Sequence, residues 1–295
     1  MIAIDLGSNT IRFIEYDGVG WGKSFEKIVK TAEALYQTHQ IGDPAVQRII
    51  EAIREAQKKF DFTLHDVVGV TTAAMRLATN AGSVLEAIYD ATGIRFTVID
   101  AADEAKWTLR AVQYRLHNLE IEPSSFILAD IGGGSTELIR FEKGKVKAVS
   151  LNIGIVTMSE SSDTTELLEE KIHSFRNEIR RNITPPANFS LVLTAGTPTT
   201  IAAYLLGMDY ASYDPGRING FRLSLVDCFR VYDELLQMDE HTRTRYVGIG
   251  RERLIVAGIL MVTSIYSALG IDDAIVVDDG LREGVALAYF DHQAL

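Results

Sequence analysis

The sequence lacks most of the features that mark secreted and membrane proteins. Its 295 residues contain one cysteine, Cys228, so an internal disulfide is excluded and a reducing cytoplasm is expected. The longest apolar run, residues 254–262, is too short to span a bilayer. No positively charged leader precedes the first apolar stretch at Ile2, which argues against secretion. We therefore expect a cytoplasmic protein without a membrane segment.

Positive charge is also scarce. Lysine and arginine total 29 against 40 acidic residues, which gives a net charge of −11. A broad surface for nucleic acid or anionic membranes is therefore not expected, and an anionic substrate would need a local cluster of donors. The six histidines are scattered and show no spacing typical of zinc ligands.

The remaining composition and pattern are those of a globular α/β protein. Apolar residues make up 47% and charged residues 23% of a chain long enough for two domains. Strand-like and helix-like segments alternate, which predicts an α/β architecture. We place the domains at residues 1–119 and 120–295, and leave open whether the final helix packs on the first domain. The expected strands are 2–5, 11–16, 67–72, 96–99, 126–130, 137–141, 146–150, 191–194 and 274–277, and the main expected helices are 43–60, 166–181, 223–236 and 251–269, with another beginning near residue 100.

Two short segments echo each other. "DLGSNT" begins at Asp5 and "DIGGGST" begins at Asp130, 125 residues later (130 minus 5). Each follows an apolar strand, turns through small polar residues and resumes as a strand, which suggests a duplication. The alternative is a pair of ordinary hairpin turns. The turn residues are Gly7, Ser8, Asn9 and Thr10 in the first copy and Gly132, Gly133, Gly134, Ser135 and Thr136 in the second.

The chemistry of these turns favours phosphate binding. Glycines let backbone amides approach an anion closely, and Ser, Asn and Thr add side-chain donors. An aspartate at the end of the preceding strand, Asp5 or Asp130, can hold Mg²⁺ beside phosphate oxygens. Two matched copies, each led by an aspartate, predict two phosphate loops that face one another across a cleft.

The motifs resemble those of the exopolyphosphatase and guanosine pentaphosphate phosphohydrolase (Ppx/GppA) family, within the actin-like ATPase superfamily. They extend over almost the whole chain in the family's order, and such an ordered set is highly specific. The resemblance implies an α/β fold of two actin-like (ribonuclease H-like) domains with an interdomain cleft. The motifs are "DLGSNTIRF", "VTTAAMRLATN", "DEAKWTLRAV", "DIGGGSTEL", "SLNIGIV", "AGTPTTIAA", "YDPGRING" and "DDGLREGVAL".

The resemblance also implies a reaction. Family members cleave a terminal phosphoanhydride with water, usually with Mg²⁺ or another divalent cation. The family's glutamate at the start of a helix matches Glu104, preceded by the acidic Asp103, and would act as general base on the water. Taken alone, Glu104 would be read as a helix N-terminal carboxylate favoured by the helix dipole.

Further residues match family positions. Asp130 and Glu137, seven residues apart, match acidic positions associated with metal and water, and Arg76 matches an arginine near the substrate phosphates. Outside the motifs, Glu137 would be an exposed strand residue and Arg76 a surface charge. Arg12 is equally compatible with a structural and a substrate-facing role.

A third loop is expected at Gly196 and Thr197, where a helix begins and backbone amides favour an anion. Here Ala195 replaces the first of the family's paired glycines. Lys23, Lys27 and Lys30 could extend a basic track for long polyphosphate, or could belong to a solvated helix or loop. Lys30-Thr31-Ala32 also stands where the family usually has Arg-Leu-Gly.

These observations leave three functions open. The first is hydrolysis of polyphosphate or of guanosine pentaphosphate at its 5′ end. The second is a small-molecule kinase of the same superfamily, which the "DEAKW" match disfavours. The third is a noncatalytic nucleotide- or polyphosphate-binding regulator. Neither nucleic acid nor a membrane is expected as a partner, and a homodimer is left open.

Overall fold

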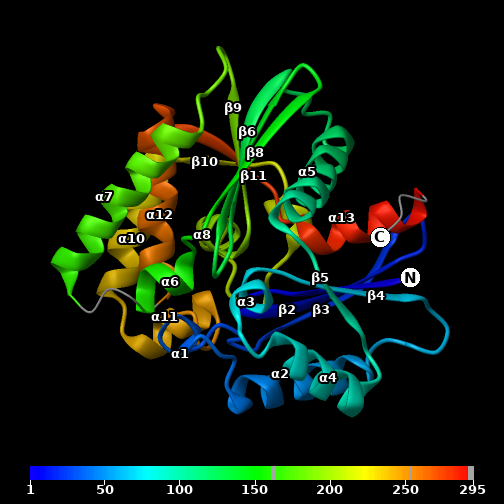
Figure 1. Ribbon diagram of the computed structural model, residues 1–295. Coiled ribbons are helices and arrows are strands. Elements are labelled where there is room, and N and C mark those ends of the chain that lie inside the picture. Colours follow the sequence, from blue (N-terminus) through cyan, green and yellow to red (C-terminus); the bar gives the residue numbers. More distant parts are fainter. Residues whose placement is uncertain (161–163, 253, 292–295) are drawn as a thin grey trace. The chain divides into compact units, whose positions relative to one another are not determined.

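The computed structural model describes residues 1–160, 164–252 and 254–291. The chain forms two compact units, each with its own sheet (Figure 1). Unit 1 contains Met1–Ala111 and the segment from Leu281 onward, and unit 2 contains Val112–Gly280. The division falls inside one helix, α5 (Ala101–Asn118).

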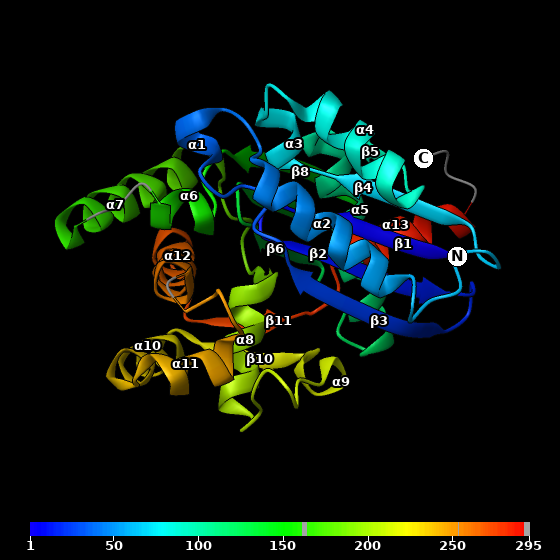
Figure 2. The same ribbon diagram turned by 90° about the horizontal axis from the view of Figure 1, so that it is seen from below.

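Unit 1 is built on a five-stranded sheet in the order β3-β2-β1-β4-β5. The first three strands are antiparallel neighbours, whereas β4 and β5 run parallel to β1. Helices α2 and α4 cover one face and α13 packs on β1 and β2 from the other (Figures 1 and 2). Cover on both faces explains why β1 is apolar at nearly every position. The elements of unit 1 besides α5 are β1 (Ile2–Leu6), β2 (Thr10–Tyr16), β3 (Trp21–Ile28), α1 (Leu35–Thr38), α2 (Asp43–Ala56), β4 (Val67–Thr71), α3 (Ala73–Leu77), α4 (Ala81–Thr92), β5 (Phe96–Val98) and α13 (Leu281–Phe290).

Unit 2 is built on a six-stranded sheet in the order β10-β11-β9-β6-β7-β8. The central strands β6, β9 and β11 are parallel, with the antiparallel strands β7 and β8 on one side and β10 on the other. Figure 1 shows α7, α10 and α12 on the same side of this sheet. The elements are β6 (Ser125–Ile131), β7 (Thr136–Glu142), β8 (Lys145–Leu151), α6 (Ile155–Glu160), α7 (Thr165–Asn182), β9 (Ser190–Thr194), α8 (Gly196–Leu205), α9 (Pro215–Ile218), β10 (Phe221–Ser224), α10 (Leu225–Gln237), α11 (Glu240–Val247), α12 (Leu254–Leu269) and β11 (Asp273–Val276).

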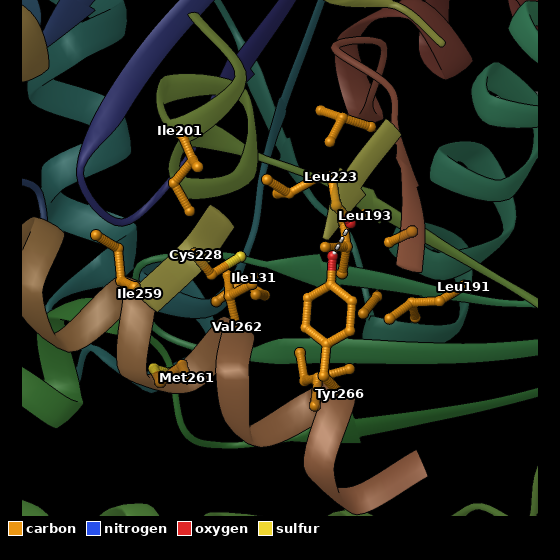
Figure 3. Close-up of a cluster of buried hydrophobic side chains, with 14 of the residues drawn as sticks. Ile131, Leu191, Leu193, Ile201, Leu223, Cys228, Ile259, Met261, Val262 and Tyr266 are labelled. Atoms are coloured by element: carbon orange, nitrogen blue, oxygen red, sulfur yellow. Dashed lines mark hydrogen bonds between the residues drawn. The ribbon is translucent and has the colours of Figure 1, made fainter. Parts of the chain in front are cut away.

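The core of unit 2 is centred on α12. Its side chains Met261, Val262 and Tyr266 are fully buried and belong to one apolar cluster with Leu193 of β9 (Figure 3). The buried hydroxyl of Tyr266 has a hydrogen-bond partner, because it donates to the backbone oxygen of Leu223 at 2.6 Å. The apolar run noted in the sequence is thus a core helix. None of the helices in the described part of the chain is long and apolar enough to cross a membrane.

The two sheets repeat one arrangement. In each, three consecutive antiparallel strands are followed by a parallel partner of the first, β4 beside β1 and β9 beside β6. This common order fits the duplication that the echo suggests, and β10 is an addition to unit 2.

The lysine-rich segment is largely a strand. A solvated helix or loop was one alternative for Lys23, Lys27 and Lys30, but Lys23 and Lys27 lie in strand β3, whereas Lys30 follows it outside any helix or strand. Phe25 between them is the register partner of Phe13 on β2, with ring centroids 5.7 Å apart. Pairing with β2 and burial of this aromatic contact therefore outweigh the polar composition of the segment.

Candidate functional site

The first predicted loop is a tight connection between β1 and β2. The N–H of Gly7 donates to the carbonyl of Thr10 at 3.0 Å. The carbonyls of Ser8 and Asn9 accept hydrogen bonds of 2.8 to 2.9 Å from a later segment, through the N–H groups of Val29, Lys30 and Ala32. The loop is therefore held on one side by its carbonyl oxygens.

The second predicted loop repeats the turn-closing hydrogen bond of Gly7 125 residues later (132 minus 7). The N–H of Gly132 donates to the carbonyl of Ser135, again at 3.0 Å. The carbonyls of Gly132 and Gly133 accept from the N–H groups of Ile155 and Val156 at 2.9 and 2.8 Å. Both loops therefore share the bond that closes the turn, and in both a later segment holds two successive carbonyls. These carbonyls lie one position earlier in the second loop, because Ser8 and Asn9 correspond to Gly133 and Gly134.

This geometry directs the amides of both loops. In a trans peptide bond the C=O and N–H groups point in opposite directions. Since the carbonyls of Gly132 and Gly133 face residues 155–156, the N–H groups of Gly133 and Gly134 point away from them. The same reasoning turns the N–H groups of Asn9 and Thr10 away from residues 29–32. Successive amides that point the same way form an anion-binding concavity. That the two loops face a common cleft stays a prediction.

A close backbone approach fixes the second loop. A Cβ atom on Gly154 would lie 2.4 Å from the backbone carbon and oxygen of Gly133, so only glycine fits. The hydroxyl of Thr136 adds a 2.7 Å hydrogen bond to the carbonyl of Ile153. The glycine of the "SLNIGIV" motif, to which the sequence assigns no role, therefore packs directly against the loop.

Two acidic side chains lie beside the second loop. Asp130 on β6 and Glu137 on β7 are direct cross-strand partners. Glu137 is 1% exposed, and its carboxylate accepts a 2.8 Å hydrogen bond from the hydroxyl of Ser150 on β8. Asp130 is half-buried. Sequence reasoning identified both acids but missed Ser150, whose signal is its register opposite Glu137.

Unit 1 has three residues at the register positions that Asp130, Glu137 and Ser150 occupy in unit 2, but their charges differ. Asp5 on β1 pairs in register with Arg12 on β2, and Arg12 pairs with Glu26 on β3. Arg12 forms a 3.3 Å ion pair with Glu26. A guanidinium therefore occupies in unit 1 the position that a carboxylate, Glu137, occupies in unit 2.

The donor set beside the second loop fits Mg²⁺. Asp130 and Glu137 offer carboxylate oxygens, and Mg²⁺ is commonly held by one or two carboxylates together with waters and substrate phosphates. Asp5 is less suited, because its cross-strand neighbour is the cation Arg12. Among the residues described, no group of three or more His, Cys, Asp and Glu side chains gathers as a metal site.

The predicted base and the predicted phosphate arginine contact each other in unit 1. Nη1 of Arg76 donates to the carboxylate of Glu104 at 2.8 Å and to the carbonyl of Ile99 at 2.9 Å. Glu104 is 8% exposed and lies in the first turn of α5. The side chain of Asp100 caps this turn by accepting from the N–H groups of Ala102 and Asp103 at 2.9 and 2.8 Å. Cap and ion pair together fix the orientation of Glu104.

The third predicted loop lies where α8 begins. Gly196 is its first helical residue, and Ala195 before it has φ 76° and ψ 178°. Thr197 is 4% exposed, and its hydroxyl lies against Gly258 of α12. The hydroxyl of Thr200 donates to the carbonyl of Gly196 at 2.6 Å. A phosphate at this loop would therefore meet backbone N–H groups rather than the hydroxyl of Thr197.

A further ion pair braces the parallel strands of unit 2. Arg115 of α5 donates to both carboxylate oxygens of Asp279, from Nε and, at 3.1 Å, from Nη2. The carbonyl of Asp279 accepts a 2.9 Å hydrogen bond from the hydroxyl of Thr194 at the end of β9. Thr194 is the register partner of Asp130. Sequence reasoning missed this pair, because 164 residues separate its members.

Comparison with known proteins gives a consistent result. The family model described as "Ppx/GppA phosphatase family" matches residues 24–292. The chain is similar to Exopolyphosphatase 2 of Mycobacterium tuberculosis, at 27% identity over 97% of both chains. It is also similar to guanosine-5'-triphosphate,3'-diphosphate pyrophosphatase of Aliivibrio fischeri, at 25% identity over 98% of this chain and 59% of that protein.

Solved structures agree. The crystal structure of the Aquifex aeolicus member of the Ppx/GppA family matches with a TM-score of 0.77 and 27% identity, over 100% of this chain and 98% of that one. The predicted fold of two actin-like α/β domains is thereby confirmed. With the family model covering nearly the whole chain, the chain belongs to the Ppx/GppA phosphatase family.

Proposed function

We propose that this protein hydrolyses a terminal phosphoanhydride, either of inorganic polyphosphate or at the 5′ end of guanosine pentaphosphate. The observation that carries the proposal is the pair of similar loops. In each loop a later segment donates hydrogen bonds to two successive carbonyls, so the N–H groups of the same peptide bonds point away from that segment and can bind an anion. The names of the similar proteins from M. tuberculosis and A. fischeri supply the two substrate classes. Both substrates present the terminal phosphate that such amides bind.

Glu104 is the proposed general base. Its carboxylate is nearly buried and oriented by Arg76, whereas a mobile surface carboxylate would spend most of its time out of position. Glu104 takes a proton from the attacking water as the bond to the terminal phosphorus forms, and the shortened chain leaves with the bridging oxygen. The guanidinium of Arg76 stabilises the charge that develops on the phosphoryl oxygens.

Asp130 and Glu137 are the proposed metal ligands. Ser150 orients the carboxylate of Glu137, and the strand register holds Asp130 beside it. Mg²⁺ held there would neutralise charge on the phosphate oxygens and so ease the attack of water on the terminal phosphorus. This assignment predicts loss of activity in excess chelator.

Phosphate release by the purified chain tests the proposal. Short polyphosphate, long polyphosphate and guanosine pentaphosphate are each incubated with Mg²⁺, using wild type and Glu104→Gln. Release from one substrate by the wild type alone supports hydrolysis and identifies the substrate class. Absence of release from all three overturns it, and tight binding of one would then favour the noncatalytic regulator.

A further inference from the structure

The segment that holds the first loop is itself held by an arginine. This segment, Val29–Glu33, which we call the strap, follows β3 and donates three N–H groups to the carbonyls of Ser8 and Asn9. Arg48 on α2 donates from Nε to the carbonyl of Val29 at 2.8 Å. Its Nη2 reaches the carbonyl of Lys30 at 3.4 Å and the carboxylate of Glu33 at 2.7 Å.

The strap is an irregular segment that needs such support. Lys30 has φ 49°, a left-handed conformation that costs energy in residues other than glycine. Within the strap, the N–H of Glu33 bonds to the carbonyl of Lys30 at 3.1 Å, which closes a single turn. The strap belongs to no helix or strand, so the loop carbonyls and Arg48 satisfy backbone groups that regular structure would otherwise pair.

Arg48 projects from a firmly seated helix. Ile49 and Ile50, its neighbours on α2, are buried, as are Val46 and Ile53 one turn away on either side. Arg48 therefore links a rigid helix to the strap, and the strap links directly to the loop carbonyls. The amide directions of the loop depend on that chain of hydrogen bonds.

We propose that Arg48 is a positioning residue for the first phosphate loop, acting through the strap. The inference rests on the proposed phosphohydrolase function and adds to it the group that preorganises the loop. Without Arg48 the strap relaxes and releases the carbonyls of Ser8 and Asn9. The peptide planes of the loop can then rotate, so phosphate affinity falls before the chemistry of Glu104 is affected.

The structure offers matched variants. Arg48→Met removes the hydrogen bonds that Arg48 donates to the strap. Arg48→Lys keeps the positive charge but loses the planar guanidinium that reaches two carbonyls and a carboxylate. Glu33→Gln removes the charge of the ion pair and leaves the carbonyl bonds of Arg48. Arg54→Met is the control, because Arg54 lies on the same helix and donates instead to the carbonyl of Ala91.

Steady-state phosphate release from the substrate that wild type cleaves is measured for all five proteins. Arg48→Met is expected to raise KM about tenfold with kcat lowered less than about threefold, because displaced donors weaken binding. Arg48→Lys should recover little, and Glu33→Gln should raise KM less than Arg48→Met does, because the two carbonyl bonds of Arg48 remain. Arg54→Met should stay within about twofold of wild type. A KM for Arg48→Met equal to that of Arg54→Met would overturn the inference.

Calorimetric titration with sodium triphosphate separates this inference from the proposed function, and circular dichroism checks that each variant is folded. Triphosphate binding that weakens about tenfold in Arg48→Met supports the inference even if wild type releases no phosphate. Equal affinities in wild type and Arg48→Met, or absence of binding to wild type, refute it. If Arg48→Met does not fold, Arg48→Lys carries the same comparison.

Discussion

Arg76 and Glu104 form a 2.8 Å ion pair, although 28 residues separate them in the sequence. The same nitrogen of Arg76 also donates to the carbonyl of Ile99, so the arginine is fixed at two points. The proposed base and the proposed phosphate-binding arginine thus touch each other, and they should behave as one unit because each sets the position of the other.

Substitution of the pair tests this coupling. Glu104→Gln should lower kcat by at least about 100-fold, since general-base catalysis contributes that much or more. Arg76→Met should also lower kcat, and the double variant should lose much less than the product of the two single losses. The four proteins of this cycle are compared by phosphate release at saturating Mg²⁺. Fully multiplicative losses would mean that the two groups act independently.

Ser150 gives a test of the metal assignment. Its hydroxyl orients the buried carboxylate of Glu137, and loss of such a partner typically weakens metal binding 10- to 100-fold. Ser150→Ala should therefore raise the Mg²⁺ concentration for half-maximal activity by about tenfold. Ser174→Ala, an exposed position on α7, is the control and should leave the Mg²⁺ titration unchanged. Identical titrations for both variants would argue against Glu137 as a ligand.

Ala195 holds a backbone conformation that suits glycine. Its φ of 76° with ψ of 178° lies in a region that is almost exclusively glycine's. Ala195→Gly should therefore stabilise the protein by about 1 kcal/mol. Ala203→Gly, inside α8, should instead destabilise it by about 1 kcal/mol, because glycine there only loosens a helix. Urea unfolding measures both changes, and a loss of stability in Ala195→Gly would contradict the strain.

Thr31 carries a buried hydroxyl that makes no hydrogen bond within the described part of the chain. Replacement by the similarly shaped valine should stabilise the protein by about 1 kcal/mol, because an unpaired buried hydroxyl is costly. Thr71→Val is the matched control, since the buried Thr71 hydroxyl donates to the carbonyl of Leu6 at 2.8 Å. That control should lose about 1 kcal/mol. Destabilisation by Thr31→Val would reveal a partner for its hydroxyl.

Cys228 tests the packing of unit 2. Burial raises the pKa of its thiol to about 12, and the side chain belongs to the α12 core cluster (Figure 3). A raised pKa keeps the thiol neutral at pH 8, and only the thiolate reacts quickly with a disulfide reagent. The native protein should therefore resist labelling at pH 8, whereas the protein in guanidinium should label at once. Rapid labelling of native protein would show that this core opens readily.

Much of the fold was accessible from the sequence, because its hairpins and helices carry local signals. The strand predicted at 67–72 is β4, and the helix predicted at 166–181 is α7. β10 was missed because it leads straight into α10, so its last two residues were assigned to the helix expected at 223–236. The expected helix at 223–236 begins two residues later, since Ser224 caps it by accepting from the N–H of Asp227.

The site was accessible in part. The loops and acids were predicted because their spacing is local and their motifs resemble a known family. Contacts between segments that are distant in the chain could not be predicted from the sequence. Examples are the contacts of Arg48 with the strap and of Gly154 with the second loop. Such contacts are set by tertiary packing, which leaves no fixed spacing in the chain.

The rows Asp5–Arg12–Glu26 and Asp130–Glu137–Ser150 have a consequence for how the two halves came to differ. If both halves descend from one ancestral half, they share its strand register, and they differ at these positions in their side chains. The second strand carries the decisive exchange, Arg12 against Glu137. Under the proposed assignment, one half carries a fixed cation, Arg12, whereas the other presents two carboxylates, Asp130 and Glu137, that would bind a metal cation from solution.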